Sequence, residues 1–300
     1  MRRLTEAWHV WVDETRIRLA RSDALLLLAV LGLLTGLLAG AVIVVFRLSV
    51  VGIQQMMLPG HAENYEALPL WARVALPILA AILLAIMFRW FSRGIHVLGV
   101  ARVLERMALH QGECTPRAFL LQFFGAAIAI IGGHSVGREG PHVFLGASAG
   151  SLLGQHLSVP HNVTRALVGC GAAAGIAASF NTPLAGVVFA LEVVMMEYTV
   201  ASFIPVILAA VSATALSQAV FGDAPAFSLP PMALGSLSEL GVVLLLGVAA
   251  GAVSALFNQS IQSVAARARP LAIHWRVLLA GLAMAVFASV LPDVMGIGYD

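Results

Sequence analysis

The stretch that decides the fold reads Gly132-Gly133-His134-Ser135-Val136-Gly137-Arg138-Glu139-Gly140-Pro141, and it places two charges inside an extremely apolar region. Hydrocarbon gives an ionised side chain no solvent, so a glutamate at membrane depth normally faces a cavity or a pathway. Glycines let backbone N–H groups approach a ligand closely, and a proline suits the first turn of a following helix. A helix that begins here would direct its N–H groups and positive dipole end at the glycines, which indicates an anion site.

The composition predicts an all-α, polytopic membrane protein. Of the 300 residues, 60% are hydrophobic and 11% are charged, and the mean hydropathy is +0.94. A soluble domain of this length would need far more polar surface. The net charge of +2 is too small to indicate a nucleic-acid partner. Cys114 and Cys170 have no metal-ligand spacing, so we expect neither a metal nor an organic cofactor.

Several uncharged or nearly uncharged segments are long enough to cross a hydrocarbon core of about 30 Å. We expect spans at residues 24–46, 68–88, 199–221, 240–257 and 277–291. The mixed stretch at 89–117 predicts a short amphipathic helix at a membrane interface. Residues 118–131 are apolar but short for a perpendicular crossing, and the glycine-rich stretch interrupts them at depth.

A second break follows at residues 181–183, Asn-Thr-Pro, and a helix carrying Glu192 is expected over 184–196. Between the two breaks, residues 143–154 and 169–179 are rich in Gly, Ala and Ser, which lets membrane helices pack backbone to backbone. Broken helices persist in lipid only where they are buried in protein or line a cavity. Two breaks in one chain therefore indicate a transporter or a channel.

The N-terminal residues 1–22 alternate charged and aromatic residues, which predicts an amphipathic helix on the membrane surface. Five arginines precede the first span, so the positive-inside rule places the N-terminus in the cytoplasm. We expect a bacterial-type inner membrane.

Two G-x-S-x-G sequences, at 133–137 and 146–150, raise the alternative of an intramembrane serine hydrolase with His134 or His156 as base. The nucleophile elbow needs a strand before it and a helix after it, whereas a Phe- and Ala-rich helix is expected before residue 133. A motif without its structural context is weak, so we expect no enzyme activity and no catalytic residue.

At Gly137-Arg138-Glu139-Gly140-Pro141 and at residues 178–186, ASFNTPLAG, the sequence resembles the ClC family of chloride channels and chloride/proton antiporters. The resemblance implies a homodimer with one anion pathway per subunit, built from inverted halves of tilted, broken and re-entrant helices. On this basis, residues 23–221 are expected to form the first half-repeat and 222–238 a linker loop. Residues 239–300 would begin a second half that is incomplete here.

The resemblance also implies roles for individual residues. Glu139 is expected to be the gating glutamate, and the backbone amides of Arg138, Glu139 and Gly140 are expected to bind chloride. Ser92, Gly94 and Ile95 are a possible further part of the anion path. The implied partners are chloride, the transported ion, and membrane lipid. The expected function is that of a voltage-gated-type chloride channel.

The sequence departs from the family pattern at two places, one in the anion path and one in the coupling of chloride to protons. Aligning Gly94 and Ile95 with the family's GSGIP segment puts Arg93 at the coordinating serine and His96 at the proline. The inner proton-transfer glutamate of the family's exchangers is replaced by Val193, and a valine cannot carry protons. This favours passive conduction, with chloride/proton antiport through another acid, Glu192 or Glu197, as the alternative.

A third departure concerns the second half. The family's GxFxP segment and its pore tyrosine belong to later helices, and Tyr299 does not align with that tyrosine. An alternative of another class is therefore a truncated, inactive subunit that only dimerises.

Overall fold

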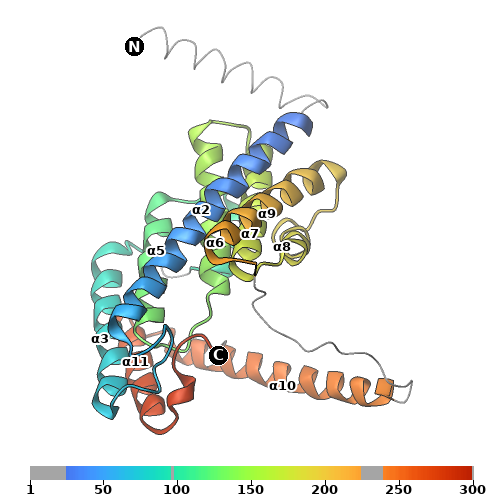
Figure 1. Ribbon diagram of the computed structural model, residues 1–300. Coiled ribbons are helices and arrows are strands. Elements are labelled where there is room, and N and C mark those ends of the chain that lie inside the picture. The colour runs from blue at the N-terminus through green and yellow to red at the C-terminus, as the bar shows by residue number, and fades with distance from the viewer. Residues whose placement is uncertain (1–24, 96–97, 224–238, 299–300) are drawn as a thin grey trace.

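The computed structural model describes residues 25–95, 98–223 and 239–298, and every regular element in these ranges is a helix (Figure 1). In chain order the elements are α2 (Leu25–Met57), α3 (Leu70–Phe91), α4 (Val100–Leu109), α5 (Pro116–Ile131), α6 (Glu139–His156), α7 (His161–Phe180), α8 (Pro183–Phe189), the π-helix η1 (Ala190–Met195), α9 (Val200–Phe221), α10 (Glu239–Ala268), α11 (Ile273–Val290) and the 3-10 helix η2 (Pro292–Val294). The expected N-terminal helix at 1–22, most of the linker at 222–238, and residues His96 and Tyr299 lie outside the described residues.

Among the described helices, α2, α3, α7, α9, α10 and α11 are long and apolar enough to cross a membrane. The all-α membrane fold expected from the composition is confirmed. Helix α4 is the short amphipathic helix expected near residue 100, and α5 and the α8–η1 pair are shorter apolar helices.

Two helices run further than expected. Helix α2 continues beyond residue 46 to Met57, because the side chain of Arg47 is half-buried against protein and does not end the helix. Helix α10 continues beyond residue 257 to Ala268, since polar residues such as Asn258 remain compatible with a helix and the first proline comes only at Pro270. The first charged or polar residue after an apolar run was therefore a less reliable sign of a helix end than a proline was.

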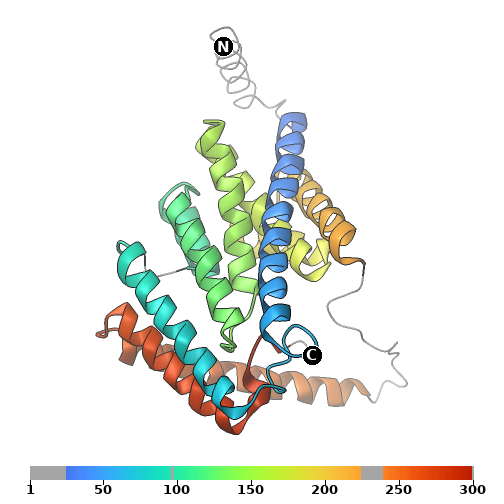
Figure 2. The same ribbon diagram turned by 60° about the vertical axis from the view of Figure 1, so that its left-hand side comes forward.

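The central packing unit is the antiparallel pair α6 and α7, with α2 and α9 beside it (Figures 1 and 2). At Gly146 and Gly171 an added Cβ would collide with the carbonyl of the other residue, so the two backbones touch directly. Gly150 meets the carbonyl of Leu167 in the same way. The small residues predicted to allow close packing therefore do so at these positions.

A second group is formed by α3 and α11, which pack along one another. In both ribbon views α10 extends away from the other helices. No side chain in its most apolar 18-residue stretch is buried. Gly281 on α11 fits directly against Ala81 on α3, which fixes the spacing of that pair.

Candidate functional site

The break between α5 and α6 forms as the glycine-rich stretch predicted. Helix α5 ends at Ile131, α6 begins at Glu139, and Pro141 lies in the first turn of α6. Gly133 has φ +71, a conformation that few other residues adopt. The first-turn amides of α6, including those of Glu139 and Gly140, therefore point back toward the glycine-rich connection, where the helix dipole is positive.

The side chain of Glu139 folds back over Gly137. A Cβ added at Gly137 would lie 3.0 Å from the Glu139 carboxyl carbon and would collide with its Oε2. Glu139 is exposed in this structure. Since Gly137 lies just before the helix, the carboxylate occupies the region in front of the N-terminus of α6, where an anion would bind.

The two signature motifs, far apart in sequence, meet at this point. The Arg138 guanidinium carbon lies 5.4 Å from the centroid of the Phe180 ring. The ring Nδ1 of His142, a fully buried residue, lies 2.6 Å from the Ser179 hydroxyl oxygen. The start of α6 is therefore joined to the end of α7, directly before the second break.

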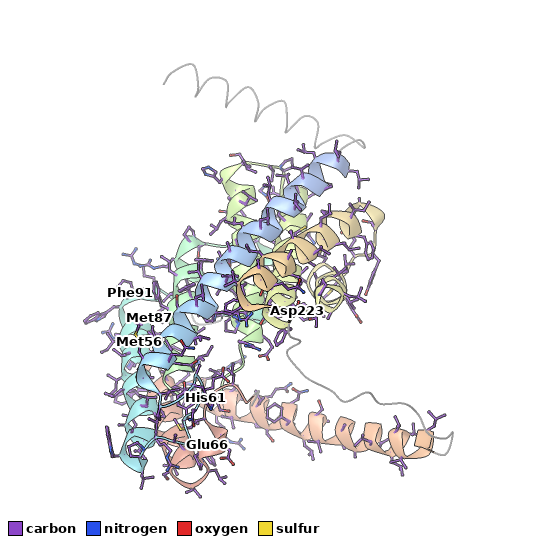
Figure 3. All side chains as sticks on the ribbon, in the orientation of Figure 1. Met56, His61, Glu66, Met87, Phe91 and Asp223 are labelled. Atoms are coloured by element: carbon purple, nitrogen blue, oxygen red, sulfur yellow. The ribbon has the colours of Figure 1, made fainter. Side chains whose placement is uncertain are left out.

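The second break is held against α9. Asn181 adopts a left-handed conformation (φ 57) that ends α7, and its Nδ2 donates to the carbonyl of Asp223 at 2.7 Å. Figure 3 labels Asp223, which follows α9. The side-chain amide of Gln218 donates to Asn181 Oδ1, also at 2.7 Å. These bonds fix where α8 begins at Pro183.

The third candidate segment, Ser92, Gly94 and Ile95, forms a tight turn after α3. The Ile95 amide donates to the Ser92 carbonyl at 2.9 Å, and Arg93 and Gly94 have φ of +41 and +88. Ser92 is buried, whereas Gly94 is exposed. The contact with α6 is made beyond the turn, where the Cβ position of Gly99 lies 3.8 Å from the Gly140 carbonyl carbon.

Tyr65, in the loop between α2 and α3, contacts the end of α5 and the glycine-rich connection that follows it. Its hydroxyl donates to the carbonyl of Ile130 at 2.7 Å, with Ile131 O at 3.2 Å, and accepts from Gln54 Nε2 at 2.9 Å. The ring also lies against Gly133. Burial raises the pKa of Tyr65 to about 12. The last carbonyls of α5 thus accept from a side chain remote in sequence, in addition to the bond that Ile130 O accepts from the Gly133 amide at 3.0 Å, and sequence reasoning did not find this side-chain contact.

The acids considered for proton transfer lie on or after η1. Glu192 is exposed on η1, and the position after it is Val193. Glu197 accepts hydrogen bonds from the hydroxyls of Thr199 and Ser202, at 3.3 and 3.2 Å.

Neither G-x-S-x-G sequence has the setting of a nucleophile elbow. Residues 133–137 lie in the connection between two helices, and 146–150 lie inside α6. His134 Nε2 lies 3.2 Å from the carbonyl of Pro77, on α3, and His156 is exposed at the end of α6. The strand that an elbow requires is therefore replaced by a helix at both places.

Sequence comparison finds relatives among known transport proteins. The family model described as "Voltage gated chloride channel" matches residues 79–300. A ClcB-like protein of Ralstonia nicotianae is 32% identical over 249 residues, which are 80% of this chain and 58% of that protein. An "H(+)/Cl(-) exchange transporter ClcA" of Vibrio cholerae is 37% identical over 148 residues, 48% of this chain and 32% of the transporter. The chain thus spans about half the length of these relatives, or less.

Solved structures share the fold. A CLC-type fluoride/proton antiporter has a TM-score of 0.76 at 24% identity, covering 92% of this chain and 68% of its own. A slow cyanobacterial Cl⁻/H⁺ antiporter has a TM-score of 0.74 at 20% identity, covering 91% of this chain and 66% of its own. At these identities the likeness concerns the fold alone.

Proposed function

The chain belongs to the voltage-gated chloride channel family, the ClC family, and from this premise we propose that it conducts chloride through a membrane pathway gated by Glu139. The observation that carries the proposal is the position of the Glu139 carboxylate, folded over Gly137 in front of the N-terminus of α6. A carboxylate there and a chloride ion are competing anions for one set of amide donors.

In this mechanism the donors are the backbone amides of Arg138, Glu139 and Gly140 at the start of α6. Amides and a helix dipole hold an anion less strongly than a full positive charge would, so the ion can also leave. Protonation of Glu139 removes its negative charge, and the side chain then gives up the site to chloride. The turn at Ser92–Ile95, whose chain continues to Gly99 beside Gly140, would form a neighbouring part of the path.

We propose passive conduction rather than exchange, because Val193 stands where the exchangers of the family carry a proton-transfer acid. The second candidate is chloride/proton antiport, and the Vibrio cholerae relative, whose name is that of an exchange transporter, favours it. In that case Glu192 or Glu197 would have to carry the proton. Either function makes this integral membrane protein a transport protein rather than an enzyme.

The assembly follows from the same premise. We propose a homodimer in a bacterial inner membrane, with a cytoplasmic N-terminus and with residues 23–221 as one half-repeat. The linker at 222–238 would lead to the second half, which begins at residue 239.

The gate is tested by chloride efflux from liposomes that contain the purified protein. Wild-type efflux should rise as pH falls, whereas Glu139→Gln should conduct at all pH values, because its neutral amide cannot act as the competing anion. Asn258→Gln on α10, far from the site, is the control. Equal efflux across pH in wild type and Glu139→Gln would reject the gate.

The same liposomes separate conduction from exchange. An imposed chloride gradient should drive no proton movement against a pH gradient if conduction is passive. If protons do move against the pH gradient, and Glu192→Gln or Glu197→Gln abolishes that movement, antiport is established instead. A protein that dimerises but passes no chloride in any variant would support the inactive-subunit alternative.

A further inference from the structure

Arg47 lies inside the apolar helix α2 with its guanidinium group turned toward the neighbouring helices. Its Nη1 donates to the carbonyl of Ala178, at 3.4 Å, and to the hydroxyl of Ser217, at 3.3 Å. Its guanidinium carbon lies 3.9 Å from the centroid of the Phe221 ring. Arg47 therefore connects α2 to the last turn of α7 and to the last turns of α9.

The partners of Arg47 do not neutralise its charge. They are a carbonyl, a hydroxyl and an aromatic ring, and among the described residues no carboxylate lies within salt-bridge distance of it. A charged side chain in a membrane span is costly, and such residues face the interior of a bundle and mark ion pathways. We therefore expect the charge of Arg47 to have a function.

The location of this charge is the C-terminal end of α7. The last carbonyls of a helix carry roughly half a negative charge, which would repel an anion nearby. Here the Ala178 carbonyl accepts from Arg47 and from Ser217, the latter at 2.8 Å, and the Arg138 guanidinium stacks near Phe180. Two arginines thus offset the negative end of α7 where it approaches the proposed gate.

The contacts from Arg47 to the gate form a short chain. Ser179, next to Ala178, lies 2.6 Å from the ring of His142, and His142 is in the first turn of α6 after Glu139. The Ala178 carbonyl, which accepts from Arg47, is thus one residue away from the partner of the His142 ring. The positive potential of Arg47 therefore extends to the start of α6.

Two other arginines on helices packed against α6 lie elsewhere. Arg165 lies against Gly112, at the opposite end of α7, and is exposed. Arg102 on α4 forms an ion pair with Glu105 at 2.7 Å.

We propose that Arg47 is a positioning residue for the transported anion, whose charge offsets the negative end of α7 and raises chloride occupancy at the N-terminus of α6. The inference rests on the proposed function, since it assumes that chloride binds at this helix terminus. Because other side chains separate Arg47 from the site, its charge attracts the ion without binding it directly, and exit remains possible.

The test measures chloride flux against chloride concentration in liposomes, in the Glu139→Gln background where the gate is open. A unit charge about 10 Å away, at an effective dielectric constant of about 20–40, changes anion affinity roughly 4- to 15-fold. Adding Arg47→Gln should raise the half-saturating chloride concentration by that factor and leave the maximal flux in place. Arg47→Lys loses the planar contact with the Phe221 ring but retains a positive charge, so it should stay within about twofold of the background.

Arg165→Gln is the matched control. It removes an exposed arginine at the other end of α7, the helix whose C-terminal end Arg47 contacts, and it should change neither the half-saturating chloride concentration nor the maximal flux. An unchanged half-saturating concentration in Arg47→Gln would overturn the inference. If Arg47→Gln does not fold, Arg47→Lys carries the test, and a shift of fourfold or more in that variant would contradict the role of charge. Failure of Glu139→Gln to differ from wild type would instead reject the proposed function, so the two failures are distinguishable.

Discussion

Gly137→Ala tests whether the Glu139 carboxylate occupies the position that the structure gives it. An alanine Cβ would lie 3.0 Å from the carboxyl carbon and would collide with Oε2, so the side chain must shift, which disfavours its present position. Gly137 is not in the left-handed region, so alanine adds no backbone strain of that kind.

The size of the effect follows from the cost of this overlap. Overpacking costs typically about 1–3 kcal/mol, and the lower part of this range applies because the carboxylate is the end of a flexible side chain. We call the arrangement closed when the carboxylate lies in front of α6 and open when it has moved away. Destabilising the closed arrangement by about 1–2 kcal/mol corresponds to roughly a 5- to 30-fold shift of the equilibrium toward the open one. We therefore expect chloride efflux under conditions where the carboxylate closes the proposed pathway to rise by about that factor.

The assay is efflux from liposomes, with two comparisons. Gly52→Ala, on α2, adds a Cβ with no atom within 4 Å and should leave efflux unchanged. In Glu139→Ala there is no carboxylate to displace, so adding Gly137→Ala should have no further effect. The placement of the carboxylate would be refuted if Gly137→Ala had the same efflux rate as wild type. It would also be refuted if Gly137→Ala raised efflux by the same factor in the Glu139→Ala background.

Three further predictions concern the scaffold. Tyr65→Phe should lower the free energy of unfolding by about 1–3 kcal/mol at neutral pH, because the buried side-chain amide of Gln54 loses its acceptor and the Ile130 carbonyl loses one of its two donors. Since burial raises the Tyr65 pKa from 10.0 to about 12, wild-type stability is full below pH 10 and falls as pH rises toward 12. Phenylalanine should abolish that alkaline loss in melting curves, and an identical alkaline loss in both proteins would contradict it. Ser151→Ala should cost about 1–3 kcal/mol, since its hydroxyl accepts from the Cys114 amide and donates to the Gly112 carbonyl, both at 2.7 Å. Denaturation that leaves its midpoint unmoved would show that this network contributes little. Gly171→Ala should destabilise by about 1–3 kcal/mol or more because its Cβ meets backbone, whereas Gly52→Ala, with no atom within 4 Å, should not; equal melting temperatures for the two would contradict the direct backbone contact of α6 with α7.

The sequence predicted those parts of the fold that local chemistry determines. Prolines and glycines mark the ends of helices through the backbone itself, so the breaks before Glu139 and before Pro183 were found. The clustering of Gly and Ala predicted the close contact of α6 with α7, because only small residues permit it.

What the sequence did not predict depends on contacts between distant residues. Arg47 resembled an ordinary end of a span, and only its partners Ala178 and Ser217, on α7 and α9, show that the helix continues and the charge turns inward. The support of the gate segment by Tyr65 is likewise a contact across 65 residues of chain. Neither pairing leaves a local pattern in the sequence.

Chloride affinity measured by titration calorimetry tests the central claim most directly, which is that Glu139 and chloride compete for the amides at the start of α6. Wild-type affinity should increase as the pH is lowered, since protonation removes the competing carboxylate. Glu139→Gln should bind chloride more tightly than wild type at the alkaline end and show no such pH dependence. Identical affinities and identical pH dependence in the two proteins would contradict the competition and the gate with it.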